Sequence, residues 1–194
     1  MLTLKYSHNT LLIMKQNIYE LGKHQAATII NAPIESINLG DWMFTITSEE
    51  YEACSKDHQS ACQSTMPDGK ALSINVETIA GNQVVQHYIE EERTRNRAVG
   101  FSPNTVVFSE LAPDGFLLIQ VKGEIEVEKI DSNKCNLTCT VTNTTLVESI
   151  AQSIKEMVGN DDITLPHPVQ EHVEEEVVRV GKNIEEKALL EIWK

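Results

Sequence analysis

A few residues have types and spacings that could do chemistry. His172 and Glu176 are four residues apart in a segment with helical periodicity, so both side chains lie on one helix face. That spacing can chelate a metal ion or orient an imidazole. With His58 or His87 opposite, the set becomes two histidines and a carboxylate, a ligand set of non-haem iron and zinc sites. Because no sequence feature places these elements at bonding distance, we expect a solvated helix edge and no bound metal.

A second candidate is His87, in the segment VVQHYIEEE that begins at Val84. If Val85, His87 and Ile89 share the buried face of a strand, the imidazole points inward and can hydrogen-bond or protonate a ligand. The more common arrangement is a core histidine that a neighbour satisfies. A register shift of one residue would exchange the roles of His87 and Tyr88.

Cys54, His58 and Cys62 follow one another at intervals of four residues, in a segment with the pattern of a helix. On such a helix the outer sulfurs start about 12 Å apart, so a metal could reach adjacent members and hardly all three. We therefore interpret the strip as a half-buried helix face. All cysteines of the chain are expected to be free thiols, since Cys135 and Cys139 would lie about 13 Å apart on one strand.

Composition restricts the partners of this chain. It has 194 residues and a formal net charge of -13, so a phosphate backbone or an anionic membrane would be repelled. No apolar run approaches the about 20 residues of a membrane span. The apolar patch Leu11 to Met14 is too short for a signal-peptide core. We expect a cytoplasmic protein that binds no nucleic acid and inserts into no membrane.

Hydrophobic periodicity predicts the order of elements. Residues 1–23 have no sustained period and are assigned to an N-terminal extension, and 24–194 form a single domain. A strand from His24 is followed by two short helices, the second with a capping box at Thr47 and Glu50. A series of alternating strands joined by short turns then predicts an antiparallel meander, apolar on one face.

Two helices are expected after the sheet. Leu146 to Val158 forms the first, and Val169 to Lys194 has the apolar stripe of a long amphipathic helix. Among the strands, one apolar row is Leu72, Ile74 and Val76, which alternates with Ser73, Asn75 and Glu77. The stripe of the last helix, expected to be buried against the sheet, is Val169, Val173, Val177, Val180 and Ile184.

This order of elements resembles the SRPBCC superfamily, which includes START lipid-transfer domains, birch-pollen-allergen proteins and polyketide cyclases. The similar segments are Ala32-Pro33-Ile34, Tyr51 to Ser55, Val85 to Glu91 and His172 to Glu176. The resemblance implies an α+β helix-grip fold. In that fold a curved antiparallel sheet wraps a long C-terminal helix, with two short helices after the first strand, and leaves an apolar cavity.

Such a cavity leads us to expect a bound hydrophobic or amphipathic small molecule, lipid-like or polyketide-like, without a cofactor. One alternative is an enzyme of the polyketide cyclase or aromatase kind, with His87 as general acid or base. Another is a non-enzymatic subunit that binds a partner helix in the groove. The sequence leaves open whether a reaction is catalysed and whether the chain forms a homodimer. The expected ligand-binding residues are Trp42, His58, Val85, His87, Ile89, Phe101, His172 and Glu176.

Overall fold

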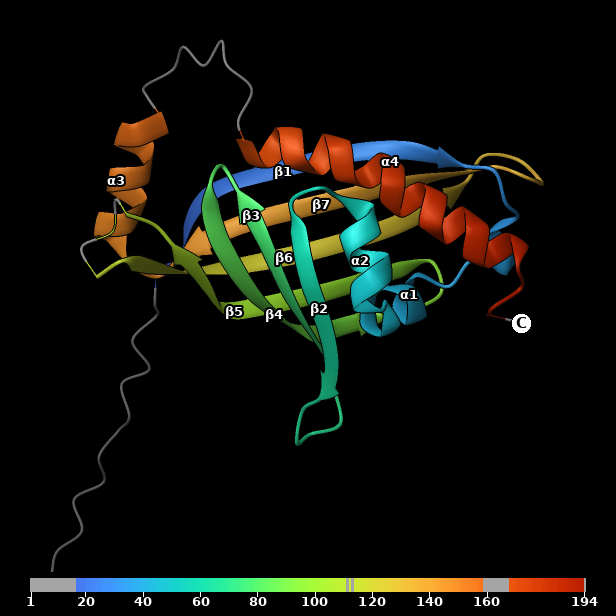
Figure 1. Cartoon of the computed structure of the whole chain (residues 1–194). Coiled ribbons are helices and arrows are strands. Elements are labelled where there is room, and N and C mark those ends of the chain that lie inside the picture. Colours follow the sequence, from blue (N-terminus) through green and yellow to red (C-terminus); the bar gives the residue numbers. More distant parts are fainter. Residues whose placement is uncertain (1–16, 111, 113, 159–167, 194) are drawn as a thin grey trace, which may run out of the picture.

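The protein consists of one curved sheet and a long C-terminal helix that lies across it (Figure 1). The computed structural model describes residues 17–193, except 111, 113 and 159–167. Helix α3 stands at one end of the sheet, and α1 and α2 lie toward the other. The elements in chain order are β1 (Tyr19–Ile30), the 3-10 turn η1 (Ile34–Ser36), α1 (Leu39–Thr45), α2 (Ser48–Cys54), β2 (His58–Thr65), β3 (Ala71–Ile79), β4 (Asn82–Arg93), β5 (Arg97–Phe108), β6 (Phe116–Lys129), β7 (Cys135–Thr145), α3 (Glu148–Val158) and α4 (Pro168–Leu189).

The sheet has seven strands in the order β1-β7-β6-β5-β4-β3-β2, and every neighbouring pair is antiparallel. Strands β2 to β7 form a meander, and β1 pairs with β7 at one edge. Ala80 and Gly81 connect β3 to β4 with φ of 52° and 78°. Positive φ at both central residues is typical of the tight hairpin turn whose twist matches the flanking strands. The expected α+β helix-grip class is confirmed.

Helix α4 buries its apolar stripe against the sheet, as expected. Gly181 lies in that stripe beside Thr28 of β1, where a Cβ would stand 2.5 Å from Thr28 Cγ2. Helix and strand therefore approach more closely than a side chain at this position would allow. The buried members of the stripe, each at most 2% exposed, are Val173, Val177, Val180 and Ile184.

Of the two short helices after β1, α2 follows the prediction at its start and departs from it at its end. The capping box of α2 is present, with reciprocal hydrogen bonds between Thr47 and Glu50. Helix α2 then ends at Cys54, and the chain is extended by Ser55. The short turn that follows leads directly into β2.

The expectation that Cys54, His58 and Cys62 share one helix face is therefore wrong. Cys54 is buried at the end of α2, whereas His58 begins β2 and Cys62 is exposed on the same strand. The strip has no common face from which to bind zinc. All the cysteines are free thiols, as expected.

Strand β1 begins at Tyr19, five residues before the expected start at His24. It therefore includes part of the segment assigned to the N-terminal extension, and residues 1–16 lie outside the described residues. In the part of the chain that the structure describes, no helix is long and apolar enough to cross a membrane.

Candidate functional site: a cavity with a histidine–carboxylate cluster

A cavity of about 680 Å³ lies between the sheet and α4. Its size is within the range of about 300 to 1,000 Å³ typical of small-molecule sites. The walls are mainly apolar, so the cavity suits a hydrophobic molecule. Apolar lining residues include Trp42, Met43, Ile46, Val84, Ile119, Val121, Ile125, Val141, Ile150, Ile154, Val173 and Val180.

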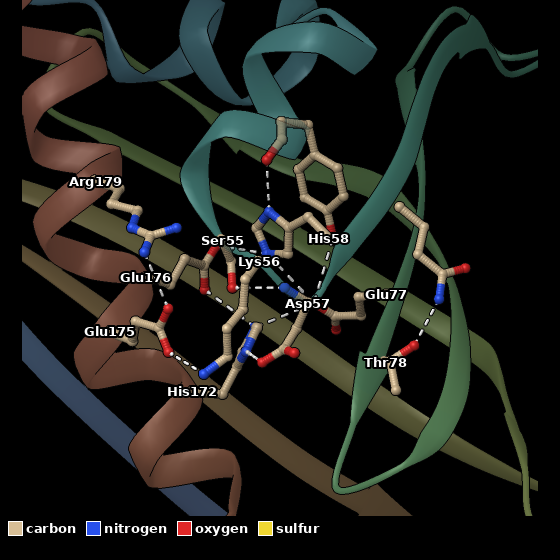
Figure 2. Close-up of polar contacts among 12 residues, drawn as sticks. Ser55, Lys56, Asp57, His58, Glu77, Thr78, His172, Glu175, Glu176 and Arg179 are labelled. Atoms are coloured by element: carbon tan, nitrogen blue, oxygen red, sulfur yellow. Dashed lines mark hydrogen bonds and ion pairs between the residues drawn. The ribbon is translucent and has the colours of Figure 1, made fainter.

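Part of the cavity wall is polar and belongs to a group of four side chains, His58, Glu77, His172 and Glu176, called here the histidine–carboxylate cluster. His58 at the start of β2 pairs with Glu77 of β3 across the antiparallel ladder. His172 and Glu176 are one turn apart on α4. Figure 2 shows these side chains converging from the helix and from the two strands. Glu77, His172 and Glu176 line the cavity, and the side chain of His58 is 1% exposed.

The ring nitrogens of both histidines face both carboxylates. His172 Nε2 lies 3.2 Å from Glu77 Oε2 and 3.8 Å from Glu176 Oε2. His58 Nε2 lies 3.5 Å from Glu77 Oε2 and 3.6 Å from Glu176 Oε1. The Nε2 atoms of the two rings thus face the same small space between helix and sheet.

Neighbouring groups hold the His58 ring in place. His58 Nδ1 is 2.7 Å from the carbonyl oxygen of Tyr51, and the two rings stack with centroids 3.8 Å apart. Because a carbonyl oxygen only accepts hydrogen bonds, Nδ1 carries the proton of the neutral ring. Nε2 of neutral His58 is then a bare acceptor directed into the cluster.

Glu77 is held by donors on both sides. Gln86 Nε2 donates to Glu77 Oε1 at 2.6 Å, and the Tyr51 hydroxyl donates to Glu77 Oε2 at 3.3 Å. His172 Nδ1, on the other side of its ring, lies 3.7 Å from Asp57 Oδ2. The orientation of the cluster therefore depends on α2, on the turn before β2 and on β4.

Burial and charge act in opposite directions on these groups. Burial alone would raise the pKa of Glu77, but His172, His58 and Gln86 lower it below its ordinary value. Burial also opposes the charged form of His172, yet Glu77 and Glu176 raise the pKa of His172 to about 9. The pKa of Glu176 is raised by burial, which outweighs the two histidines. The Glu77 carboxylate and the His172 imidazolium therefore stabilise each other's charged forms, whereas burial favours the neutral form of Glu176.

The cluster is also short of hydrogen bonds. His58 Nε2 and both ring nitrogens of His172 are buried and have no hydrogen bond of proper geometry within the described residues. Buried polar atoms are almost always satisfied, by protein, water, ligand or ion. These nitrogens meet the carboxylates around them as ion-pair contacts of 3.2 to 3.8 Å.

Of the eight ligand-binding residues expected from the sequence, three line this cavity and a fourth lies in the cluster beside it. Trp42, His172 and Glu176 line it. The Trp42 indole nitrogen also donates to Asn183 Oδ1 of α4 at 2.7 Å. His58 belongs to the cluster beside them.

The expected orientation of His87 is wrong. Strand β4 lines the cavity with Val84, Gln86 and Tyr88, so Val85, His87 and Ile89 lie on the opposite face of the sheet. Polarity could not choose between the two faces, because both rows contain apolar residues. Phe101 pairs with Ile89 in the ladder and is likewise absent from the cavity lining.

Tyr88 is accommodated inside because glycines face it. A Cβ at Gly100 would stand 2.9 Å from Tyr88 Cβ, and one at Gly123 would stand 3.3 Å from Tyr88 Cε1. Gly100 and Gly123 pair with each other in neighbouring strands β5 and β6. This pair of small residues is the sequence signal that could have placed Tyr88, rather than His87, on the inner face.

Strand β3 has the reverse of the expected polarity. The interior contains Ser73 and Glu77, which are 1% and 4% exposed, and Asn75 lines the cavity. The apolar row Leu72, Ile74 and Val76 is on the other face. The sequence-based prediction therefore missed Glu77, which pairs with the buried His58 across the ladder.

The curved antiparallel sheet, the long closing helix and the mainly apolar cavity between them define a helix-grip protein. No protein family model matches the chain, and no curated protein matches its sequence. Solved structures share the fold. TTHA0849 from Thermus thermophilus matches with a TM-score of 0.56 and 18% identity, over 87% of this chain and 98% of that one.

Two further solved structures share the fold. The Zhui aromatase/cyclase from Streptomyces sp. R1128 has a TM-score of 0.53 and 10% identity, over 91% of this chain and 96% of that one. Ara h 8.0201 has a TM-score of 0.50 and 14% identity, over 90% and 99%. At such identities the likeness shows the fold alone, which is the helix-grip fold that the resemblance to the SRPBCC superfamily implied.

Proposed function

We propose that the protein binds a hydrophobic or amphipathic small molecule in the cavity between the sheet and α4. The observation that carries the proposal is a mostly apolar space of about 680 Å³ with the histidine–carboxylate cluster in its wall. The apolar walls supply most of the affinity, because burying hydrocarbon is worth about 25 cal/mol per Å². The histidine–carboxylate cluster orients the polar group of the ligand. The free thiols agree with a cytoplasmic location.

Native mass spectrometry of freshly purified protein tests this proposal. We expect a non-covalent adduct of low mass that is absent from the denatured spectrum. If the native protein carries no adduct and also fails to bind a lipid-like probe, the ligand-binding proposal is contradicted. A stoichiometric polypeptide in place of the adduct would favour the partner-binding alternative. The same spectrum reports whether the chain is a homodimer, which stays a prediction.

A second candidate function is acid–base catalysis of the cyclase kind. It is favoured by His172 and Glu77, which line the cavity and lie 3.2 Å apart. A histidine paired with a carboxylate can exchange protons with a bound carbonyl compound. In this alternative His172 replaces His87 as the acid or base. A His172→Gln variant that retains the ligand and loses its conversion would select this function over simple binding.

A further inference from the structure

We propose that His58, His172 and Glu176 bind one divalent transition metal ion, such as zinc or ferrous iron, with Glu77 beside them as a fourth donor. The four groups come from β2, β3 and α4. The inference goes beyond the proposed function and does not depend on it. It also departs from the expectation drawn from the sequence, where nothing placed α4 next to β2.

The first argument is the spacing of the donor atoms. Ligand atoms of His58, His172 and Glu176 all lie within 4.8 Å of one another. Donors at about 2.0 to 2.2 Å from a tetrahedral ion stand about 3.4 Å apart. The contacts from His58 and His172 to Glu176 are 3.6 and 3.8 Å, and those to Glu77 are 3.5 and 3.2 Å. The widest separation, up to 4.8 Å, would have to close by about 1.4 Å to reach the tetrahedral spacing.

The second argument is the orientation of the rings. A metal-binding histidine usually donates its other N–H to a carbonyl or a carboxylate. His58 Nδ1 lies 2.7 Å from the Tyr51 carbonyl oxygen, and His172 Nδ1 faces the carboxylate of Asp57. The His58 ring therefore directs Nε2, as a lone pair in the neutral form, toward the shared space, and Nε2 of His172 faces the same space.

The third argument is that ring nitrogens facing this space lack hydrogen bonds. The Nε2 atoms of both histidines are buried and have no hydrogen bond within the described residues. Two carboxylates face them from opposite elements, so a dication would neutralise the charge and satisfy the nitrogens together. A proton shared among the four side chains is the competing explanation. Such a proton would lie at the 3.2 Å contact between His172 Nε2 and Glu77 Oε2, whereas the other three contacts, at 3.5 to 3.8 Å, are longer than a hydrogen bond.

Metal binding to the untagged chain tests the proposal. Elemental analysis of protein purified without added metal, and titration of chelator-treated protein with Zn²⁺ against a chromophoric chelator, should each give one equivalent per chain. Co²⁺ in place of Zn²⁺ should give visible absorption bands typical of a low-coordinate site. A wild-type chain that binds less than one equivalent in both measurements would overturn the proposal in favour of the shared proton.

Matched variants locate the ion. Glu176→Gln and His172→Ala should each lose about 100-fold or more in Zn²⁺ affinity, since loss of even a supporting group costs about 10- to 100-fold. Glu175→Gln changes the next residue of the helix, which pairs with Lys56 and Arg179, and should bind as the wild type does. His87→Ala, on the other sheet face, is the control for His172.

Folding of each variant is checked by circular dichroism. Glu176→Gln keeps the shape of the side chain, so it remains informative if His172→Ala fails to fold. Equal Zn²⁺ affinity of Glu176→Gln and Glu175→Gln would overturn the assigned ligands. Binding of an apolar probe is measured in parallel to separate the two proposals. If only the metal-site proposal is wrong, the protein still binds the probe. If only the ligand-binding proposal is wrong, the protein still binds one equivalent of Zn²⁺.

Discussion

The imidazole of His172 lies 3.2 Å from the carboxylate of Glu77, joining the helix that closes the cavity to the polar part of the sheet. Glu77 is 4% exposed, so its charge depends on the few groups that reach it. Gln86 is one of them, through the 2.6 Å hydrogen bond from its Nε2. The contacts with His172 and Gln86 explain how the buried Glu77 carboxylate is tolerated.

Removing the amide of Gln86 should therefore destabilise the protein. A hydrogen bond to a buried charged group contributes about 1.5 to 3 kcal/mol, and Gln86→Leu should lose about that much free energy of unfolding. Gln83→Leu, at an exposed position of the same strand, should stay within about 0.5 kcal/mol of wild type. Urea denaturation measures both. Equal stability of the two variants would show that Glu77 does not need this donor.

Helix α4 offers an equally direct comparison between neighbouring valines. Val177 is 2% exposed and Val178 is 58% exposed. Val177→Asp buries an unpaired carboxylate and should cost about 3 kcal/mol or more, whereas Val178→Asp should cost about 0.5 kcal/mol or less. Thermal melting resolves such a difference. Similar melting temperatures of the two variants would contradict the burial of this helix face against the sheet.

The close approach of Gly181 to Thr28 predicts that an alanine at this helix position destabilises the protein. Alanine normally stabilises a helix by about 1 kcal/mol relative to glycine. Here the new Cβ would stand 2.5 Å from Thr28 Cγ2, so Gly181→Ala should instead destabilise by about 1 to 3 kcal/mol. The double variant Gly181→Ala, Thr28→Ser removes the opposing methyl and should recover most of the loss. A stabilised single variant would mean that helix and strand are further apart.

Thiol reactivity should distinguish one cysteine from the others. Cys62 is exposed, and the rest are buried. Burial raises the pKa of Cys54 to about 12, so roughly 1 in 10,000 of its thiols is ionised at pH 8. A disulfide reagent at pH 8 should release one equivalent quickly and the remainder only on unfolding. A fast phase that survives in Cys62→Ser would contradict this burial pattern.

Elements with a clean amphipathic pattern could be predicted from the sequence. The stripe of α4 and the inward row Cys135, Leu137, Cys139 and Val141 each place apolar residues on one face, so period and burial agree. The prediction failed in β3, because Ser73, Asn75 and Glu77 face inward. The inner face of a strand is normally recognised as its apolar row, and a site that buries polar side chains reverses this pattern.

The end of α2 was missed for a different reason. Cys54, His58 and Ala61 have helical spacing, and neither glycine nor proline interrupts them. Tertiary structure ends the helix at Cys54, because His58 is taken into the ladder beside Glu77. His58, His172 and Glu176 were singled out by residue type, but only the fold places them within 4.8 Å.

The central claim is that a ligand occupies the cavity, and two adjacent residues of β6 test it most directly. Ile119 lines the cavity, whereas Leu118 is 47% exposed. Ile119→Trp should fill the space and weaken binding of a fluorescent apolar probe by about tenfold or more, while Leu118→Trp should bind within about twofold of wild type. Probe titration of both folded variants is the measurement. Probe affinity that is unchanged in Ile119→Trp would contradict ligand binding in this cavity.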